Sequence, residues 1–260
     1  MKLNEVFCHT FKAIRNRLYE KSFELYHPQS WVNSSLSLDS QFCRAVVNSG
    51  YLTFEQLLNA TYRYRLGASK NGGVIFWQID HEGRIHDGKI MYYLPDCHRN
   101  KKHNPTWVSH LLAKREGQTK GQHTTSHCLF GLHQLLILRS ALPLGSSKNS
   151  KFSIGIVEAE KTAVILSEHY PQYIWLAAGG LGELQVNKFR PLRGRKVVLF
   201  PDTDPDGKTF ASWHQRAQEV MAEPFWEDSP PIRVSPVLEL HATPEQKQRK
   251  IDLIDFLYDK

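Results

Sequence analysis

The 260-residue sequence has few cysteines and no long apolar run. Its four cysteines are scattered without Cys-x-x-Cys spacing, at Cys8, Cys43, Cys97 and Cys128. This scatter argues against a disulfide framework and against a zinc ribbon. No apolar stretch approaches the roughly 20 residues of a membrane-spanning helix, and the first residues lack the apolar core of a signal peptide. We therefore expect a cytoplasmic protein that does not engage membranes.

Nucleotide-binding loops of the common type are also missing. The glycine pair Gly72 and Gly73 lies in a polar turn, but no Gly-Lys-Ser or Gly-Lys-Thr follows it, so it is not a phosphate-binding P-loop. The absence of an ATPase motif argues against nucleases that are driven by ATP. Any chemistry on phosphates must therefore come from other residues.

Two apolar segments end abruptly in carboxylates. Residues 152–157 and 197–200 are continuous apolar runs with β-branched residues, which is typical of strands buried in a parallel sheet. Glu158 follows the first run, and Asp202 and Asp204 follow the second. Ligands gather at the carboxyl ends of such strands, and hard cations such as Mg²⁺ take oxygen ligands. The pattern predicts a site for Mg²⁺ or Mn²⁺ and phosphoryl-transfer chemistry or its reversal.

Simpler interpretations of these acids exist. A glutamate after a strand can be a solvated turn residue or can interact with a helix dipole, and residues 202–207 could form an ordinary turn. A calcium loop of the EF-hand type is excluded, because it needs a glutamate at its twelfth position and counting from Asp202 reaches Trp213. Glu160, at the start of the next helix, is expected to cap that helix or to support the site.

The order of these segments resembles a known family. A strand that ends in Glu158, a second at residues 174–180 that ends in Gly-Gly, and a third followed by Asp-x-Asp-x-x-Gly are similar to the Toprim domain of bacterial primases, topoisomerases and related nucleases. The resemblance implies a Rossmann-like, mostly parallel sheet. It also implies that Glu158, Asp202 and Asp204 are catalytic and bind metal, with Asp206 as a further metal ligand. Ala159 stands where the family commonly has glycine.

Charge is distributed unevenly along the chain. Residues 1–150 contain 19 Lys and Arg against 10 Asp and Glu, whereas residues 151–260 contain 14 against 16. A basic half suits a polyanion, and Trp107 could stack a base, so single-stranded DNA and nucleotides are the expected partners. A solvated basic face is the alternative. The candidate contacts are Lys70, Lys89, Arg99, Lys101, Lys102, Trp107, Lys161 and Lys208.

The sequence of the basic half predicts two helices followed by a β-hairpin. We expect helices at 38–47 and 53–61, the second with a capping box from Thr53 and Gln56, and a hairpin of 74–79 with 89–93 in which Trp77 is core. The string from Arg65 to Asp80, with Leu-Phe-Gly-Leu at 129–132, resembles the N-terminal subdomain of the primase catalytic core.

These patterns together predict an α/β fold in three parts. They are a basic α+β subdomain at 1–140, a linker at 141–151 and a Toprim domain at 152–260. Further elements are expected as helices at 129–139, 209–222 and 243–258 and a strand at 232–240. The last helix would place Asp252 and Asp255 on one face, either as supporting acids or as solvated carboxylates.

The resemblance implies a function in replication. We expect a metal-dependent, nucleic-acid-binding, primase-like nucleotidyltransferase of a mobile element, with a helicase or another replication protein as a possible partner. Two alternatives stay open. The same metal ions could activate water in a Toprim nuclease, or the chain could be a non-catalytic accessory protein that binds single strands.

Overall fold

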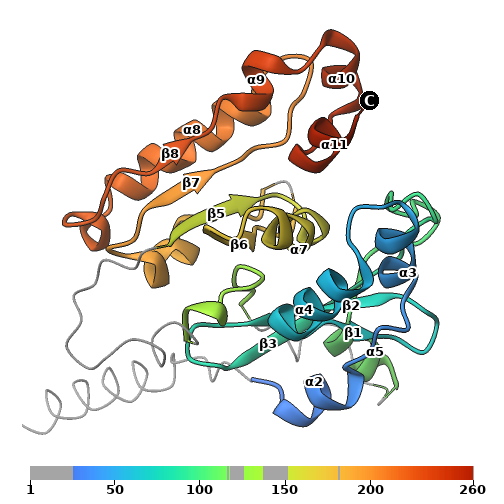
Figure 1. Cartoon of the computed structure of the whole chain (residues 1–260). Coiled ribbons are helices and arrows are strands. Elements are labelled where there is room, and N and C mark those ends of the chain that lie inside the picture. Colours follow the sequence, from blue (N-terminus) through green and yellow to red (C-terminus); the bar gives the residue numbers. More distant parts are fainter. Residues whose placement is uncertain (1–25, 116, 118–125, 137–151, 181, 260) are drawn as a thin grey trace, which may run out of the picture.

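The structure, a computed structural model, describes residues 26–115, 117, 126–136, 152–180 and 182–259. Two four-stranded sheets organise the chain (Figure 1). One is antiparallel with the order β1-β2-β3-β4, and the other is parallel with the order β6-β5-β7-β8. The chain is therefore a mixed α/β protein with a parallel sheet, which confirms that part of the predicted fold class.

The first sheet and its helices come from residues 29–115. In chain order the elements are α2 (Gln29–Ser35), α3 (Gln41–Asn48), α4 (Phe54–Tyr64), β1 (Gly67–Ala68), β2 (Val74–Ile79), β3 (Ile85–Met91), β4 (Thr106–Trp107) and α5 (Val108–Arg115). The capping box at the start of α4 is confirmed, because Thr53 Oγ1 accepts a hydrogen bond from the Gln56 N–H and the Gln56 side chain accepts one from the Thr53 N–H.

The predicted hairpin is present, and a buried carboxylate holds its turn. Asp80 accepts hydrogen bonds from the backbone N–H groups of Glu82 and Arg84 and from the Arg84 side chain. Trp77 is in the core as expected, at 1% exposure, and its indole N–H donates to Ser35 Oγ. Strand β3 begins at Ile85, four residues earlier than the predicted second strand.

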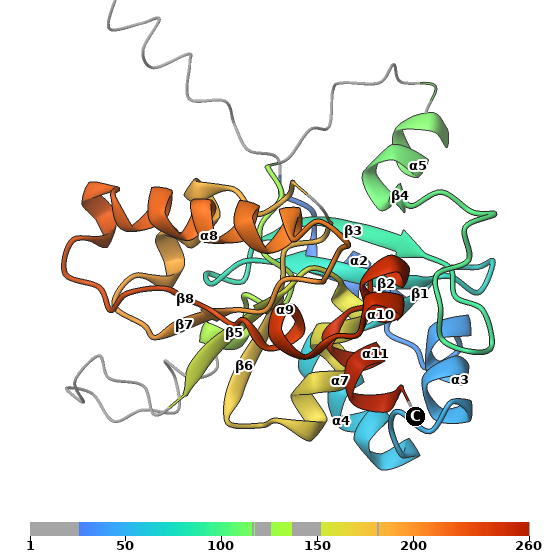
Figure 2. The same ribbon diagram turned by 90° about the horizontal axis from the view of Figure 1, so that it is seen from above.

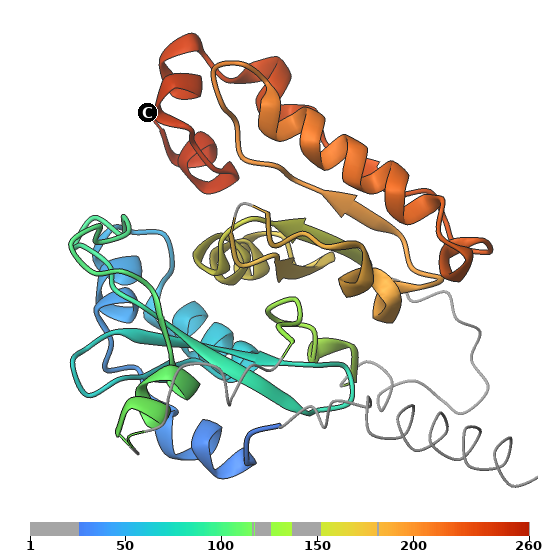
Figure 3. The ribbon, with the colours of Figure 1, turned by 180° about the vertical axis from the view of Figure 1, so that it is seen from behind.

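The parallel sheet comes from the second half. Its elements are β5 (Ser153–Val157), α7 (Glu160–His169), β6 (Tyr173–Ala177), η1 (Val186–Leu192), β7 (Val197–Leu199), α8 (Lys208–Met221), η2 (Pro224–Trp226), β8 (Arg233–Val234), α9 (Val237–His241), α10 (Pro244–Arg249) and α11 (Leu253–Tyr258). Helix α8 lies along the outer side of this sheet, and α7 lies on the side that faces the antiparallel half (Figures 1 and 3). Gly155 in β5 lets the Trp175 ring lie against the strand, because a Cβ there would come within 2.7 Å of the ring.

One of the hydrophobic core clusters spans the two halves. Phe130 forms a bridge with Ala177 at the edge of the parallel sheet, and its ring stacks on Tyr64 of α4. The Tyr64 hydroxyl hydrogen-bonds the carbonyl oxygens of Ala163 and Trp175, at 3.2 and 2.9 Å. These contacts fix the antiparallel sheet beside α7. The predicted division at 141–151 stays a prediction, since residues 137–151 lie outside the described ranges, as does the end of the predicted helix at 129–139.

Two predicted elements near the C-terminus are wrong. The strand expected at 232–240 is only the short β8, because Pro236 supplies no N–H for a sheet and helix α9 begins after it. The helix expected at 243–258 is two helices. Lys250 adopts a left-handed conformation (φ 56°), and Asp252 then caps α11. Asp252 and Asp255 therefore form a capping box rather than one helical face.

None of the helices within the described ranges is long and apolar enough to cross a membrane.

Candidate functional site

Three loops meet at the carboxyl edge of the parallel sheet. Strands β5 and β7 are neighbours in parallel register, so Glu158 after β5 and Asp202 after β7 emerge at the same edge. The turn after β6 is held beside them, because the N–H of Gly179 donates to the carbonyl oxygen of Glu158 at 2.9 Å. Gly179 and Gly180 both have positive φ values, of 96° and 147°, which glycine tolerates. The predicted order of Glu158, the glycine pair and Asp202 is thus brought together in space.

Asp202 lies in an environment rich in negative charge. Burial raises its pKa well above the usual value, and the charges of Asp252 and Glu158 raise it further. The ammonium of Lys161 acts in the opposite direction but does not outweigh these effects. A carboxylate that other carboxylates disfavour in this way gains from a cation placed beside it.

Asp204 lies two positions after Asp202, but its pKa is shifted in the opposite direction. One of its carboxylate oxygens accepts hydrogen bonds from the N–H groups of Asp206 and Lys208, and the other accepts one from the N–H of Thr209 at 2.6 Å. Burial acts to raise the pKa of Asp204, but the hydrogen bonds, above all those from Thr209, lower it to about 2. Asp204 therefore closes the turn and satisfies the first N–H groups of α8.

The C-terminal helix brings further charges to the site. The Lys161 ammonium lies 3.3 Å from an oxygen of Asp252 and 3.6 Å from one of Asp255, and the Thr162 hydroxyl donates to Asp252 at 2.6 Å. Burial acts to raise the pKa of Asp252, but Lys161 and Thr162 outweigh it and the pKa is lowered. Burial and the charge of Asp252 raise the pKa of Asp255. Burial acts to lower the pKa of Lys161, but the two acids outweigh it and raise that pKa. Asp252 is thus a buried, paired carboxylate whose charge acts on Asp202, and not a solvated one.

Lys89 and Glu160 form a buried ion pair between the halves. The Lys89 ammonium lies 3.0 and 3.1 Å from the two Glu160 oxygens and donates to the carbonyl oxygen of Gly179 at 2.6 Å. The side chains are 10% and 2% exposed. These contacts are internal, so Lys89 ties β3 to the glycine turn, and its predicted contact with phosphate stays a prediction. Glu160 is buried in this ion pair beside the glycine turn, and its expected role in supporting the site stays a prediction.

The other predicted nucleic-acid contacts fall into two groups. Lys161 is buried among carboxylates, and Trp107 is half-buried and stacks on His127 with ring centroids 3.8 Å apart. Lys208 is exposed and pairs with Asp206 at 2.6 Å, so the structure keeps Asp206 in the solvent beside a lysine. The basic residues of the antiparallel half point to solvent; they are Lys70, Arg99, Lys101 and Lys102.

Glu158 and Asp202 are the predicted metal ligands that meet at this edge, and their binding of a cation stays a prediction. Within the described ranges, no three His, Cys, Asp or Glu side chains lie close enough together to hold a metal ion by themselves. Mg²⁺, however, usually binds through one or two carboxylates and keeps several waters. Glu158 and Asp202 are two carboxylates at one edge, and burial, followed by the charges of Asp252 and Glu158, raises the pKa of Asp202.

Sequence reasoning missed two polar residues here. Thr162, a hydrogen-bond partner of Asp252, follows Glu158 by four residues in the first turn of α7, where no sequence motif marked it. Tyr93 is fully enclosed, and burial and then the charge of Glu160 raise its pKa well above the usual value. Its proximity to Glu160 spans the two halves, so no local pattern could have indicated it.

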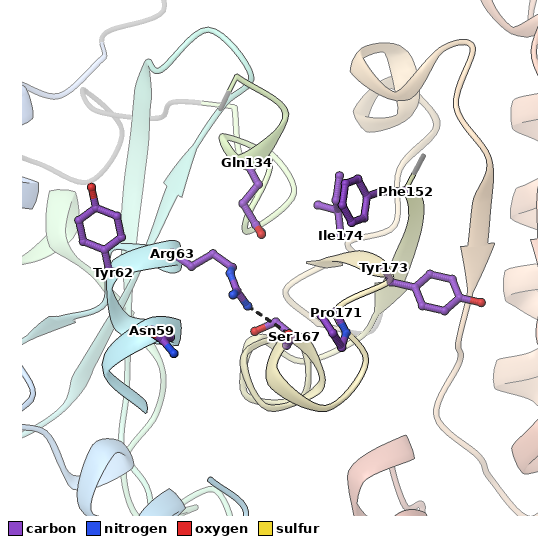
Figure 4. Close-up of a pocket in the computed structure, with 9 residues that line it drawn as sticks. All are labelled: Asn59, Tyr62, Arg63, Gln134, Phe152, Ser167, Pro171, Tyr173 and Ile174. Carbon is purple, nitrogen blue, oxygen red and sulfur yellow. Dashed lines mark hydrogen bonds between the residues drawn. The ribbon is translucent and has the colours of Figure 1, made fainter. Parts of the chain in front are cut away.

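A pocket of about 500 Å³ lies at the opposite, amino edge of the parallel sheet. Phe152 and Ile174, at the starts of β5 and β6, face α4 across it (Figure 4). Arg63 reaches over from α4 and donates to the carbonyl oxygen of Ser167 at 3.1 Å, and it pairs with Glu168 at 2.7 Å. This pocket is separate from the acids, so the carboxyl edge is the candidate site.

The features above define an α/β protein with an acidic carboxyl edge on its parallel sheet. Residues 40–203 match the family described as "Domain of unknown function (DUF6371)", and the chain belongs to this family. No curated protein matches the chain.

Solved structures with some similarity include two primase fragments. The primase fragment of the bacteriophage T7 primase-helicase protein is 14% identical, with a TM-score of 0.44 over 89% of this chain and 79% of that chain. The E. coli primase catalytic core is 14% identical, with a TM-score of 0.49 over 88% of this chain and 81% of that chain.

Proposed function

We propose that this protein is a metal-dependent enzyme of nucleic-acid synthesis, a primase-like nucleotidyltransferase with a Toprim site. Glu158 and Asp202 would hold Mg²⁺ or Mn²⁺, and Asp204 would fix the turn that presents Asp202. The observation that carries the proposal is the meeting of Glu158 and Asp202 at one sheet edge, where burial and the charges of Asp252 and Glu158 raise the pKa of Asp202. When bound, the ion would neutralise phosphate charge and stabilise the attacking and leaving oxygens.

Other residues of this chain would position the acids and bind the nucleic acid. Lys161 and Thr162 hold Asp252 behind the site, so that the acids keep their places before a metal arrives. The pair of Lys89 and Glu160 holds the glycine turn against β3. The exposed basic residues of the antiparallel half would bind the strand backbone, since lysine and arginine neutralise phosphates and release counterions.

Three observations favour this function over an ordinary turn at residues 202–207. The acids follow neighbouring parallel strands, they are partly or fully buried, and they influence one another's charge state. An acidic cluster without a cation would cost stability, because buried like charges repel. Asp206 is exposed beside Lys208 and is the weakest of the proposed ligands.

The test is an activity assay on the full chain. The protein is incubated with single-stranded DNA, Mn²⁺ and labelled ribonucleotides or deoxyribonucleotides, and the products are separated by length. We expect short new oligomers from the wild type and none from Asp202→Asn, while Asp228→Asn, which changes an exposed carboxylate near η2, keeps the activity.

The other outcomes decide among the alternatives. Shortened template without new oligomers would show that the protein is a nuclease and not a nucleotidyltransferase. Binding of single strands without either product would favour the alternative of a non-catalytic accessory protein. Unchanged activity in Asp202→Asn would overturn the site.

A further inference from the structure

Helix α4 carries a row of exposed apolar side chains on its outer face. Phe54, Leu58 and Tyr62 are 60%, 44% and 73% exposed, and the helix lies at the periphery of the molecule (Figure 2). The three residues are spaced four apart, so their side chains follow one another along one stripe of the helix. A single exposed apolar residue is ordinary, but three on one stripe form a patch that suits contact with another molecule. We call these three residues the α4 stripe.

The α4 stripe lies opposite the face by which the helix packs in its own chain. The buried residues of α4 are Leu57, Ala60 and Tyr64, which belong to the hydrophobic core that spans the two halves. On the outer face, the Arg65 guanidinium lies 4.9 Å from the centroid of the Tyr62 ring and leaves most of that ring exposed. The inner face of α4 therefore serves the fold, and the outer face is available to a partner.

The pocket of about 500 Å³ at the amino edge of the parallel sheet adjoins the stripe. Tyr62 is one of its lining residues, as are Asn59 and Arg63 from the same helix (Figure 4). Phe152 and Ile174 contribute apolar surface from the sheet, and Phe152 is itself 37% exposed. The apolar surface of the stripe thus continues into a hollow that can take an aromatic side chain.

The α4 stripe is complementary to a second copy of itself. Leu58 lies at its centre and an aromatic ring lies at each end, so the stripe is nearly the same in both directions. When two copies of α4 pack antiparallel about a twofold axis at Leu58, each Leu58 meets its equivalent, and Phe54 of each copy meets Tyr62 of the other. Each Phe54 then also lies at the mouth of the other copy's pocket.

The charges of α4 favour the same antiparallel arrangement. Glu55 is exposed in the first turn, and Arg65 follows the last turn as the C-cap residue. Antiparallel packing brings Glu55 of each copy to the end of the contact where Arg65 of the other copy lies, so unlike charges approach one another. The dipoles of the two helices also oppose one another in this arrangement. Parallel packing would place like charges and like helix ends together.

We propose that this protein forms a twofold-symmetric dimer through the α4 stripe, with the two α4 helices antiparallel. Leu58 lies on the axis, and Phe54 of each copy packs on Tyr62 and enters the pocket of the other. The apolar stripe is the centre of the contact, and exposed polar residues such as Asn59 lie around it, as in other protein interfaces. This surface contains none of the acids of the carboxyl edge, so the inference does not rest on the proposed function.

Sedimentation velocity of the full chain over a wide range of protein concentrations tests the dimer. We expect the wild type to dimerise reversibly. Leu58→Glu places two like charges face to face on the axis, and it should raise the dissociation constant of the dimer about tenfold or more. Leu240→Glu makes the same change at a leucine of α9 that is 70% exposed, and this matched control should keep the wild-type constant.

A charge exchange tests the antiparallel arrangement. Glu55→Arg should weaken the dimer, because two arginines then approach one another at each end of the contact. Glu55→Arg combined with Arg65→Glu should bind more tightly than Glu55→Arg alone, because unlike charges meet again with their signs exchanged. A double variant that dimerises no better than Glu55→Arg would overturn the antiparallel contact.

Thermal unfolding must show that each variant folds as the wild type does. Leu58 and Glu55 are exposed, and glutamate and arginine are good helix formers, so the helix should tolerate these changes. A wild type that is monomeric at every concentration, or a dimer that a folded Leu58→Glu leaves unchanged, would overturn the inference. Equal weakening by Leu240→Glu would also overturn it. The assays of nucleotidyl transfer and metal binding do not depend on any of these outcomes.

Discussion

The carboxyl edge of the parallel sheet carries buried acids, whereas exposed basic residues form a basic rim on the antiparallel half, namely Lys70, Arg99, Lys101 and Lys102. At the edge, carboxylates are buried and held by internal partners, such as Lys161 for Asp252 and backbone N–H groups for Asp204. At the rim, lysines and arginines are exposed. Buried charges cost stability unless they are paired, whereas exposed charges cost little. This difference fits the proposed roles, in which the edge would receive a cation and the rim would contact a polyanion.

The largest expected effect comes from breaking the buried pair beside the edge. Lys89→Met leaves Glu160 buried without its partner, and we expect the free energy of unfolding to fall by about 3–5 kcal/mol. Urea unfolding followed by circular dichroism measures this. Lys89→Met combined with Glu160→Leu should cost clearly less than the single change, because no lone charge remains.

The matched control is an exposed pair of the antiparallel half. Arg44→Met removes the partner of Asp39, and both side chains are largely exposed. We expect a loss of at most about 1 kcal/mol. Equal losses at the buried and the exposed pair would contradict the contrast between the edge and the surface.

Asp204 should show a smaller effect that depends on pH. Asp204→Asn weakens the cap of α8, and we expect a loss of about 1 kcal/mol at neutral pH. Because the folded pKa of Asp204 is lowered to about 2, its contribution is present above about pH 4 and is lost as the pH falls towards 2. The difference between wild type and variant in urea unfolding should shrink over that window. A constant difference would show that the carboxylate charge is irrelevant to the cap.

The contribution of Asp202 to stability should depend on pH with the opposite sign. Its pKa is raised in the folded state, so its ionisation destabilises the protein as the pH rises from about 4 through the raised value. In metal-free buffer, Asp202→Asn should therefore raise the free energy of unfolding at neutral pH. Thermal unfolding in the presence of a chelator measures the gain. A loss of stability would mean that Asp202 is satisfied without a cation.

The smallest effect on stability is expected at the basic rim. Lys101→Ala with Lys102→Ala should change the free energy of unfolding by less than about 0.5 kcal/mol. The same variant should bind all single strands more weakly and should reduce the salt dependence of binding by roughly one unit of slope for each phosphate that is no longer neutralised. Anisotropy titrations at several salt concentrations measure both. An unchanged salt slope would remove these lysines from the nucleic-acid surface.

Local patterns predicted the strands of the parallel sheet and the acids at their ends. Apolar runs bounded by turn residues located β5, β6 and β7, and the capping box located the start of α4. The meeting of Glu158 and Asp202 followed from the rule that parallel strands end at one edge. Each of these inferences needed only neighbouring residues and a general property of sheets.

The same local patterns did not predict long-range contacts or breaks between helices and strands. The pairing of Lys89 with Glu160 joins residues 71 positions apart, so the local context of Lys89 suggested an open phosphate contact instead. At residues 232–240, alternating apolar residues outweighed Pro236 in the prediction, although a proline without an N–H favours the end of a strand. The break at Lys250 has no glycine to mark it, because lysine itself adopts the left-handed conformation.

The most direct test of the central claim is a calorimetric titration of the metal-free protein with Mn²⁺. We expect saturable binding to the wild type, its loss in Asp202→Asn and in Glu158→Gln, and its retention in the exposed control Asp228→Asn. Binding that is unchanged in both folded site variants, or no binding to the wild type, would contradict a metal site at the carboxyl edge of the sheet.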